Sequence, residues 1–208
     1  FAAITGHDRL SEVLDGIAAA RLAGITAIKL NSVLMRGIND DELEGFIAFT
    51  HEVSVIAARG PDGSVAAFDP GENVHEAGIL RQTTVPARLT NPQRTDAVLI
   101  AARILNALDY VGVLGVELFV TPEGLIVNEI APRVHNSGHW TQTGCAVDQF
   151  EQHIRAVAGL PLGDGNRYAD VVMENLIGDD VLRVPDLLKA RDTAVHLYGK
   201  GASRPGRK

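Results

Sequence analysis

The sequence contains a single cysteine, and it lacks both a long apolar run and a signal-peptide pattern. One cysteine, Cys145, excludes an intrachain disulfide and a cysteine-based metal cluster, so we expect a reducing, cytoplasmic environment. No apolar stretch is long enough to span a bilayer. The formal charge of −7 argues against nucleic acid and anionic membranes as partners.

The length and composition suit a globular protein. With 208 residues, 46% of them hydrophobic, the chain can form one good-sized domain or two small ones. It begins at Phe1 without an initiator methionine, so we expect it to be a piece of a longer protein.

An acidic hairpin is the main feature of the sequence. Residues 111–120 and 125–130 read as two apolar strands around the turn at Pro122, Glu123 and Gly124. Glu117 and Glu129 lie on opposite arms, and antiparallel pairing would set them at a similar height. Two carboxylates on one face repel each other unless a cation or a shared proton intervenes, and magnesium takes one or two carboxylates together with phosphates and water. The pattern therefore predicts a metal site for a nucleotide.

The residues of the hairpin also allow a simpler interpretation. A strand glutamate usually points to solvent. The two glutamates by themselves favour a metal site and a solvent-facing position about equally. The loop that follows favours a site, because it is dense in polar side chains that a solvated turn does not need. These side chains belong to Asn128, Arg133, His135, Asn136, Ser137 and His139.

The remaining pattern predicts an α+β fold with an antiparallel sheet and flanking helices. Strands are expected at residues 52–59, 64–68, 74–80, 169–175 and 194–197, with turns at 60–63 and 69–73. Helices are expected at 91–108 and 147–158. Polar Glu72, Asn73 and His75 read as turn residues or as part of a site, whereas His153 and Cys145 read as structural.

Five stretches of the sequence carry a family resemblance. The stretches ELFV, NEIAPRVHNSGHW and QFEQHIRAVAGLPLG, together with FDPGENVHEAGIL and YGKGASRPGRK, are similar to the carboxy-terminal half of 5-(carboxyamino)imidazole ribonucleotide synthase. This family comprises ATP-grasp enzymes of purine biosynthesis. The resemblance covers about residues 52–208 and predicts an ATP-grasp catalytic portion at 51–160 and a truncated small domain at 161–208.

The resemblance implies a reaction and roles for individual residues. ATP would phosphorylate bicarbonate to carboxyphosphate, whose carbon dioxide is captured by the amine of 5-aminoimidazole ribonucleotide. Mg²⁺ would lie on Glu117 and Glu129, with Arg133, His135 and Asn136 as catalytic residues, the last two also binding substrate. The arrangement is compatible with a homodimer.

The basic tail has two interpretations. A glycine-rich end with Lys200, Arg204 and Arg207 is usually disordered, but such residues can also hold a phosphate. The resemblance favours the second interpretation for Lys200 and Arg207, as ligands of the ribotide 5′-phosphate.

Residues 1–50 differ in kind from the rest. Their predicted helix–strand–helix order suits an α/β layer. The stretch GITAIKLNSVLMRGINDDELEGFIAFT resembles part of the radical S-adenosylmethionine GTP cyclase of molybdenum cofactor synthesis. Radical chemistry is excluded for this chain because the iron–sulfur cluster needs three cysteines. Since this segment stands where half of the nucleotide clamp belongs, the chain reads as a hybrid.

Three functions therefore remain as hypotheses. The first is an ATP-dependent ligase that is incomplete by itself. The second is a non-catalytic remnant that binds a ribotide or a partner. The third is a fragment of molybdenum cofactor synthesis, which the missing cysteines disfavour.

Overall fold

The computed structural model describes residues 47–199, and all structural statements below concern that part of the chain. The whole chain divides into two compact units, Phe1–Ile47 and Ala48–Lys208. The expected helix–strand–helix segment before residue 47 lies outside the described residues, and so do Lys200 and Arg207. Predictions made for them stay predictions.

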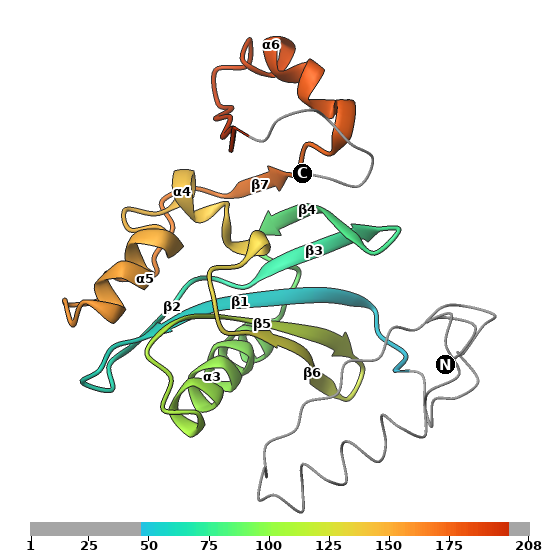
Figure 1. Ribbon diagram of the computed structural model, residues 1–208. Coiled ribbons are helices and arrows are strands. Elements are labelled where there is room, and N and C mark those ends of the chain that lie inside the picture. Colours follow the sequence, from blue (N-terminus) through green and yellow to red (C-terminus); the bar gives the residue numbers. More distant parts are fainter. Residues whose placement is uncertain (1–46, 200–208) are drawn as a thin grey trace, which may run out of the picture. The chain divides into compact units, whose positions relative to one another are not determined.

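A seven-stranded antiparallel sheet is the centre of the described part (Figure 1), with the order β6-β5-β1-β3-β4-β7 and β2 paired to β1. The strands are β1 (His51–Arg59), β2 (Val65–Ala67), β3 (Gly71–Glu76), β4 (Ile79–Val85), β5 (Gly112–Thr121), β6 (Gly124–Ala131) and β7 (Val171–Glu174). The helices are α3 (Asn91–Ala107), α4 (Thr141–Gly144), α5 (Gln149–Val157) and α6 (Val184–Leu187), with 3₁₀ turns η2 (Asn136–Gly138) and η3 (Gly178–Arg183). The predicted α+β class is confirmed.

One face of the sheet packs against α3. Successive side chains of a strand point to opposite faces, so Val53 and Val55 of β1 share this face with Val116 of β5. Ala101 and Leu105 of α3 complete the cluster and are fully buried. The helix starts with a capping box, in which the side chains of Thr90 and Gln93 each bond to the other residue's backbone N–H.

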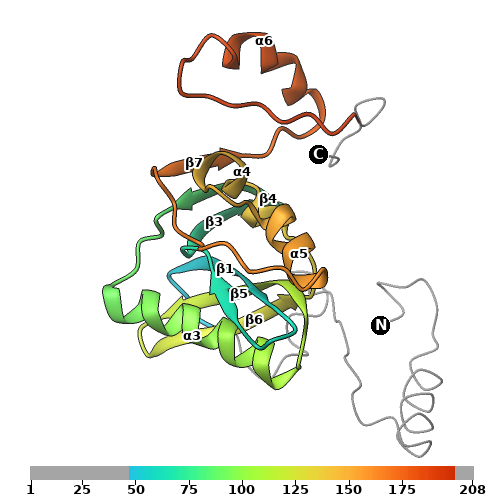
Figure 2. The ribbon, with the colours of Figure 1, turned by 90° about the vertical axis from the view of Figure 1, so that its left-hand side faces the viewer.

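The opposite face packs against the segment that follows β6. Ile56 of β1 and Val113 of β5 contact a second buried cluster that includes Phe68, Trp140 and Cys145. Figure 2 shows α3 on one side of the strands and α4 and α5 on the other. β1 reads as a continuous apolar run because both of its faces are covered.

The turn between β3 and β4 lies at other residues than the sequence predicted. A turn was expected at residues 69–73 because of Pro70 and Gly71, but Gly71 already belongs to β3. The chain reverses instead at Ala77 and Gly78, which have positive φ values of 49° and 73°. Two such residues form a tight hairpin turn, and the alanine gives no sequence signal for it. The strand expected at residues 74–80 therefore runs across this turn, and most of β4 was not predicted.

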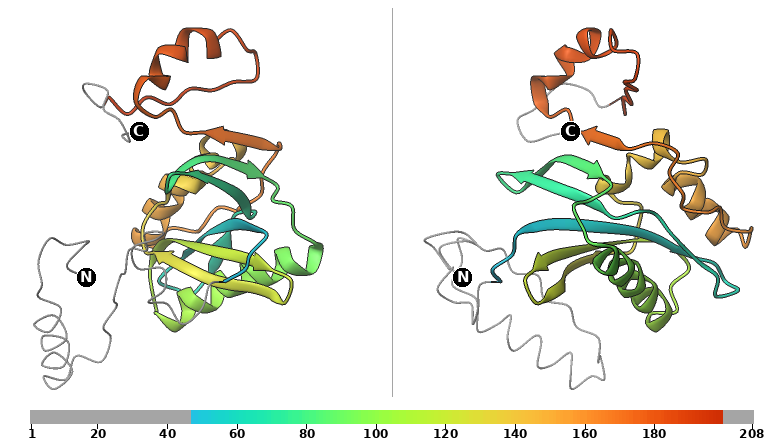
Figure 3. Two further views of the ribbon diagram at one scale, coloured as in Figure 1. Left: turned by 90° about the vertical axis from the view of Figure 1, so that its right-hand side faces the viewer. Right: turned by 180° about the vertical axis from the view of Figure 1, so that it is seen from behind.

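The end of the described chain also differs from the prediction. β7 confirms the strand expected near residues 169–175, and it joins the sheet by pairing with β4. Figure 3 shows the chain continuing past this sheet edge into η3 and α6, which the sequence analysis did not predict. Residues 194–197 form no strand, because this apolar run pairs with no described strand and lines a pocket.

No helix between residues 47 and 199 is long and apolar enough to cross a membrane.

Candidate active site

The two glutamates of the hairpin are direct partners in the sheet. Glu117 of β5 lies opposite Glu129 of β6 in the antiparallel register, so both side chains stand on one face. The same face carries Ser54 of β1, which pairs with Glu117 in the register. It is the face opposite α3, because the α3 cluster contains the intervening Val116 and Leu118. We call it the acidic face.

A β-bulge separates the acidic pair from the end of the hairpin. The register shifts after Glu117, so Leu118 pairs with Val127 and Asn128 has no partner across the strands. A bulge of this kind turns the strand and re-aims its side chains, and bulges are frequent beside active sites. Glu129 and Asn128 are exposed, whereas the side chain of Glu117 is only 18% exposed.

Burial makes the charge of Glu117 costly. Loss of hydration raises the pKa of its carboxyl above the ordinary value, and the neighbouring carboxylates of Glu129 and Glu52 raise it further. His75 and Arg133 act in the opposite direction and lower that pKa. The acidic face therefore has a surplus of negative charge that a cation would relieve.

His135 connects the loop after β6 to the acidic face. Its Nε2 lies 3.5 Å from Oε1 of Glu117, and the residue is 9% exposed. Its Nδ1 lies 2.8 Å from the hydroxyl of Ser137, which receives a 2.7 Å hydrogen bond from Ser54. The buried amide of Gln149 on α5 holds the backbone of His135 through two hydrogen bonds.

Arg133 and Asn136 flank His135 but behave differently. Arg133 is exposed, and its guanidinium donates to the carbonyl of Val134 at 3.0 Å. The amide of Asn136 is buried, and neither its oxygen nor its nitrogen has a hydrogen-bond partner among the described residues. A buried amide left unsatisfied costs free energy, which a ligand with a donor and an acceptor would recover.

The polar residues of β3 lie in side-chain pairs. Glu72 accepts from the Arg88 guanidinium, which holds the pKa of that carboxyl below its ordinary value. His75 contacts Glu52 at 2.9 Å. Asn73 accepts from Thr83, yet its amide nitrogen is buried without a partner in the described part of the chain. The amide nitrogen of Asn73 is thus a donor that a ligand could use. His75 is close enough to Glu117 to lower the pKa of its carboxyl.

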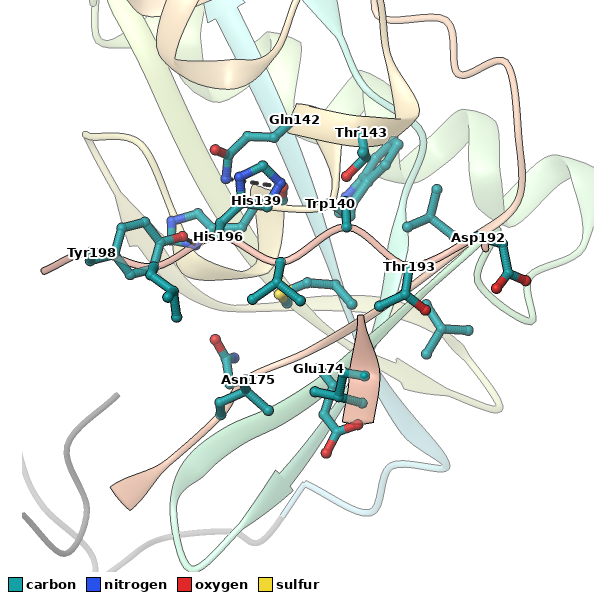
Figure 4. A pocket seen from close by; sticks show the side chains of 18 of the residues that line it. His139, Trp140, Gln142, Thr143, Glu174, Asn175, Asp192, Thr193, His196 and Tyr198 are labelled. Carbon is teal, nitrogen blue, oxygen red and sulfur yellow. Dashed lines mark hydrogen bonds between the residues drawn. The ribbon is translucent and has the colours of Figure 1, made fainter. Parts of the chain in front are cut away.

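A separate pocket of about 1060 Å³ lies between residues 139–143 and 169–199. Figure 4 shows His139, Trp140 and Thr143 lining it from one side and Glu174 and Thr193 from another. His139 meets the hydroxyl of Tyr198 at 2.7 Å. Of the polar loop residues that the sequence analysis named, His139 lines this pocket, whereas Glu117, Glu129 and His135 do not.

Sequence reasoning missed the residues that support His135. Ser54 is a polar residue inside the apolar run VSVIAA, and that interruption is the signal that could have found it. Gln149 gave no signal, because a glutamine near a helix start is ordinarily exposed. The structural interpretations of Cys145 and His153 are confirmed, since Cys145 is buried and His153 accepts from the backbone of Val113.

Comparison with known proteins gives the family. The model of the ATP-grasp domain matches residues 29–150, which is more than half of the chain. The chain belongs to the ATP-grasp family. A second model, that of the phosphoribosylaminoimidazole carboxylase C-terminal domain, matches residues 171–208. The ATP-grasp match includes residues 29–50, for which the sequence suggests another origin, and that suggestion stays a prediction.

The relatives of this ATP-grasp chain are N5-carboxyaminoimidazole ribonucleotide synthases, as the motifs predicted. The synthase of Brucella melitensis is 59% identical over 167 residues, 80% of this chain and 46% of the relative. The crystal structure of the Thermus thermophilus synthetase has a TM-score of 0.74 at 47% identity, covering 79% of this chain and 46% of that one. The Aspergillus clavatus synthase in complex with ADP and 5-aminoimidazole ribonucleotide has a TM-score of 0.73 at 34% identity, covering 77% and 45%. The chain thus spans about half the length of these relatives.

The donor set of this ATP-grasp chain fits magnesium. The acidic face offers two carboxylates from facing strands, which is the number that magnesium usually takes from a protein when phosphates and water complete its shell. Within residues 47–199, no cluster of three or more acidic, histidine or cysteine side chains could form a closed protein site for a metal. Two carboxylates leave coordination positions of an ion for phosphate oxygens and water.

Proposed function

We propose that this chain carries the phosphate-facing part of an ATP-dependent ligase that carboxylates 5-aminoimidazole ribonucleotide with bicarbonate. The observation that carries this proposal is the pairing of Glu117 with Glu129 on one face of the sheet, with Nε2 of His135 3.5 Å from Oε1 of Glu117. The similarity to synthases, one of them crystallised with ADP and this ribotide, supports the choice of substrates.

The proposed reaction brings two anions together. The γ-phosphoryl group of ATP passes to an oxygen of bicarbonate and ADP leaves, so a triphosphate must approach a negatively charged acceptor. The carboxyphosphate then separates into phosphate and carbon dioxide, and the ribotide amine attacks the carbon dioxide and loses a proton. Glu117 and Glu129 would hold Mg²⁺, which when bound neutralises phosphate oxygens.

The loop residues supply the other roles in this proposal. Arg133 is a permanently charged, planar donor near the acidic face, suited to bicarbonate or the transferring phosphoryl group. Asn136 offers a buried donor and a buried acceptor, which suits the ribotide or its nascent carboxyl group. His135 orients the same group. Lys200 and Arg207 would bind the 5′-phosphate, as part of the same proposal.

Several further predictions belong to this proposal. Residues 51–160 would form the catalytic portion and 161–208 the small domain, in a cytoplasmic protein and as a homodimer. Residues 1–50, which resemble the radical S-adenosylmethionine enzyme, would contribute no radical chemistry, because the chain has one cysteine. The alternative is a non-catalytic remnant that binds a ribotide or a partner.

Phosphate release from magnesium ATP and bicarbonate tests the proposal. We expect release by the full chain to increase when 5-aminoimidazole ribonucleotide is added, and we expect Glu129→Gln to reduce it at least about 100-fold, the usual scale for loss of a group that stabilises transferring charge. Coupled detection of inorganic phosphate measures both rates.

Glu123→Gln is the matched control. It makes the same substitution in the same hairpin, on an exposed turn residue, and should keep the rate of the unsubstituted chain. Ribotide-independent release that is equal in all three proteins would reject the ligase and leave the non-catalytic alternative.

A further inference from the structure

The backbone of His135 is held by a buried side chain to which the proposed reaction assigns no role. Gln149 is fully buried, and its amide pairs with the backbone of His135 as a neighbouring strand would. Its oxygen accepts from the backbone N–H at 2.9 Å and its nitrogen donates to the carbonyl at 2.7 Å. These two bonds fix the position of the His135 backbone.

The ring of His135 lies directly on β5. A Cβ atom added to Gly115 would come within 2.9–3.0 Å of Cβ and Cγ of His135, closer than real Cβ contacts allow. The absence of a side chain at position 115 therefore makes room for the imidazole next to Glu117. With the backbone clamped and the ring packed on a strand, the ring has little freedom to turn over.

Two donors converge on one ring nitrogen. The backbone N–H of Ser137 donates to Nδ1 of His135 at 3.4 Å, as in a helix cap. The hydroxyl of Ser137 lies 2.8 Å from the same nitrogen. Because Ser54 already donates its hydroxyl hydrogen to the oxygen of Ser137, the hydrogen of Ser137 is available for Nδ1.

This arrangement determines the tautomer of His135. A nitrogen that accepts hydrogen bonds carries no hydrogen in the neutral ring, so the proton must be on Nε2. Nε2 is the nitrogen that faces Glu117 at 3.5 Å. The ring thus presents an N–H donor to the acidic face.

We propose that Ser54 and Ser137 are positioning residues that hold His135 as the Nε2–H tautomer, so that it serves as a fixed hydrogen-bond donor to an anionic oxygen of the reacting group. This inference rests on the proposed function and narrows the role of His135 from general proton handling to donation. All three side chains are buried, which strengthens each bond and penalises the alternative tautomer.

Ring-nitrogen NMR on the full chain, without substrates, tests this assignment. We expect the His135 signals, identified by their loss in His135→Gln, to show a bare Nδ1 and a protonated Nε2 near neutral pH. Ser137→Ala should shift the tautomer ratio roughly fivefold toward Nδ1–H, the factor that corresponds to one typical hydrogen bond of about 1 kcal/mol. Ser54→Ala should give a smaller shift in the same direction, and Ser137→Thr should restore the original ratio.

Ser64→Ala is the matched control, because it removes a hydroxyl from a hairpin turn away from the site. An Nδ1–H ring in the unsubstituted chain, or a ratio that Ser137→Ala leaves unchanged, would overturn the inference. If Ser137→Ala does not fold, the signals of the unsubstituted chain decide the question. The experiment needs no turnover, so its failure and that of the proposed ligase activity are distinguishable. Where turnover is measurable, Ser137→Ala should lower kcat more than it changes KM.

Discussion

At the scale of single residues, the carboxylate of Glu117 is the group with the clearest conflict between stability and function. Burial and the neighbouring acids raise the pKa of this carboxyl, so ionisation costs more in the folded protein than in the unfolded chain. A site for a cation needs the ionised form. The protein therefore loses stability at neutral pH for a charge that only a bound ion would compensate.

Glu117→Gln should stabilise the metal-free protein at neutral pH. Because the folded pKa is raised, the wild-type carboxyl loses stability as pH rises from the ordinary glutamate value of about 4.3 through the folded value, whereas glutamine does not titrate. A gain of about 1 kcal/mol would raise the melting temperature by about 2–4 °C. Thermal unfolding in the presence of a chelator, at pH 7 and below pH 4, measures the difference, which should shrink at the lower pH.

The exposed Glu123→Gln again provides the control and should leave the melting temperature unchanged at both values. A Glu117→Gln variant that is no more stable than the wild type at pH 7 would contradict the cost assigned to the buried charge.

At the scale of elements, a partly buried ion pair attaches the segment after β7 to the sheet. Arg81 of β4 donates to Asp180 of η3 at 2.8 Å, and the same carboxylate accepts from the backbone of Ile177 at 3.1 Å. Asn175 adds a hydrogen bond to the carbonyl of Leu80. Most side chains of η3 and α6 are exposed, so these polar contacts carry much of the attachment.

Asp180→Asn should loosen η3 and α6 without affecting the β5–β6 hairpin. Arg81 holds the pKa of Asp180 below its ordinary value, so the ionised form contributes stability above the ordinary aspartate pKa of about 3.9 and loses it as pH falls through the lowered value. Hydrogen exchange followed by mass spectrometry should show faster uptake in residues 178–187 at pH 7. Asp96→Asn, on the exposed side of α3, is the control. Uniformly faster exchange in the sheet would show instead that the pair supports the whole fold.

At the scale of the whole molecule, nucleotide binding by the full chain is the property that follows from the proposed site. It spans about half the length of its relatives, and the ATP-grasp match covers residues 29–150. Binding reports on the site even where turnover is absent, because a ligand that binds only the folded state stabilises it by mass action.

Magnesium ADP should raise the melting temperature of the full chain. At about 100 times the dissociation constant the stabilisation is about 2.7 kcal/mol, or roughly 5–10 °C for a chain of this size. A chelator or Glu129→Gln should remove the part of the shift that depends on the metal, whereas Glu123→Gln should keep it. Differential scanning fluorimetry measures all four conditions. An equal shift with and without the chelator would reject Glu117 and Glu129 as metal ligands.

The sequence predicted the hairpin and its acids but not their surroundings. Strand alternation and the turn at Gly124 were sufficient to put Glu117 and Glu129 on opposite arms at a similar height. The register that starts at Thr121 and Gly124 would by itself set Glu117 opposite Asn128, and it is the bulge that brings Glu129 opposite Glu117. The bulge at Asn128 was not predictable, since nothing in the apolar run of β6 signals an extra residue. The same limit explains the error at β3 and β4, where a positive φ at Ala77 decided the turn.

The sequence by itself determined the α+β class, the resemblance to the synthases and the identity of the polar loop residues, because these follow from periodicity and from long contiguous motifs. Only the tertiary structure brought Ser54 and Gln149 to the His135 loop, since these residues come from β1 and α5, whereas Ser137 lies two residues from His135 in the chain. Which ring nitrogen faces Glu117 depends on those contacts. Hydrogen bonds between distant segments depend on how strands and helices pack, and local sequence does not encode that packing.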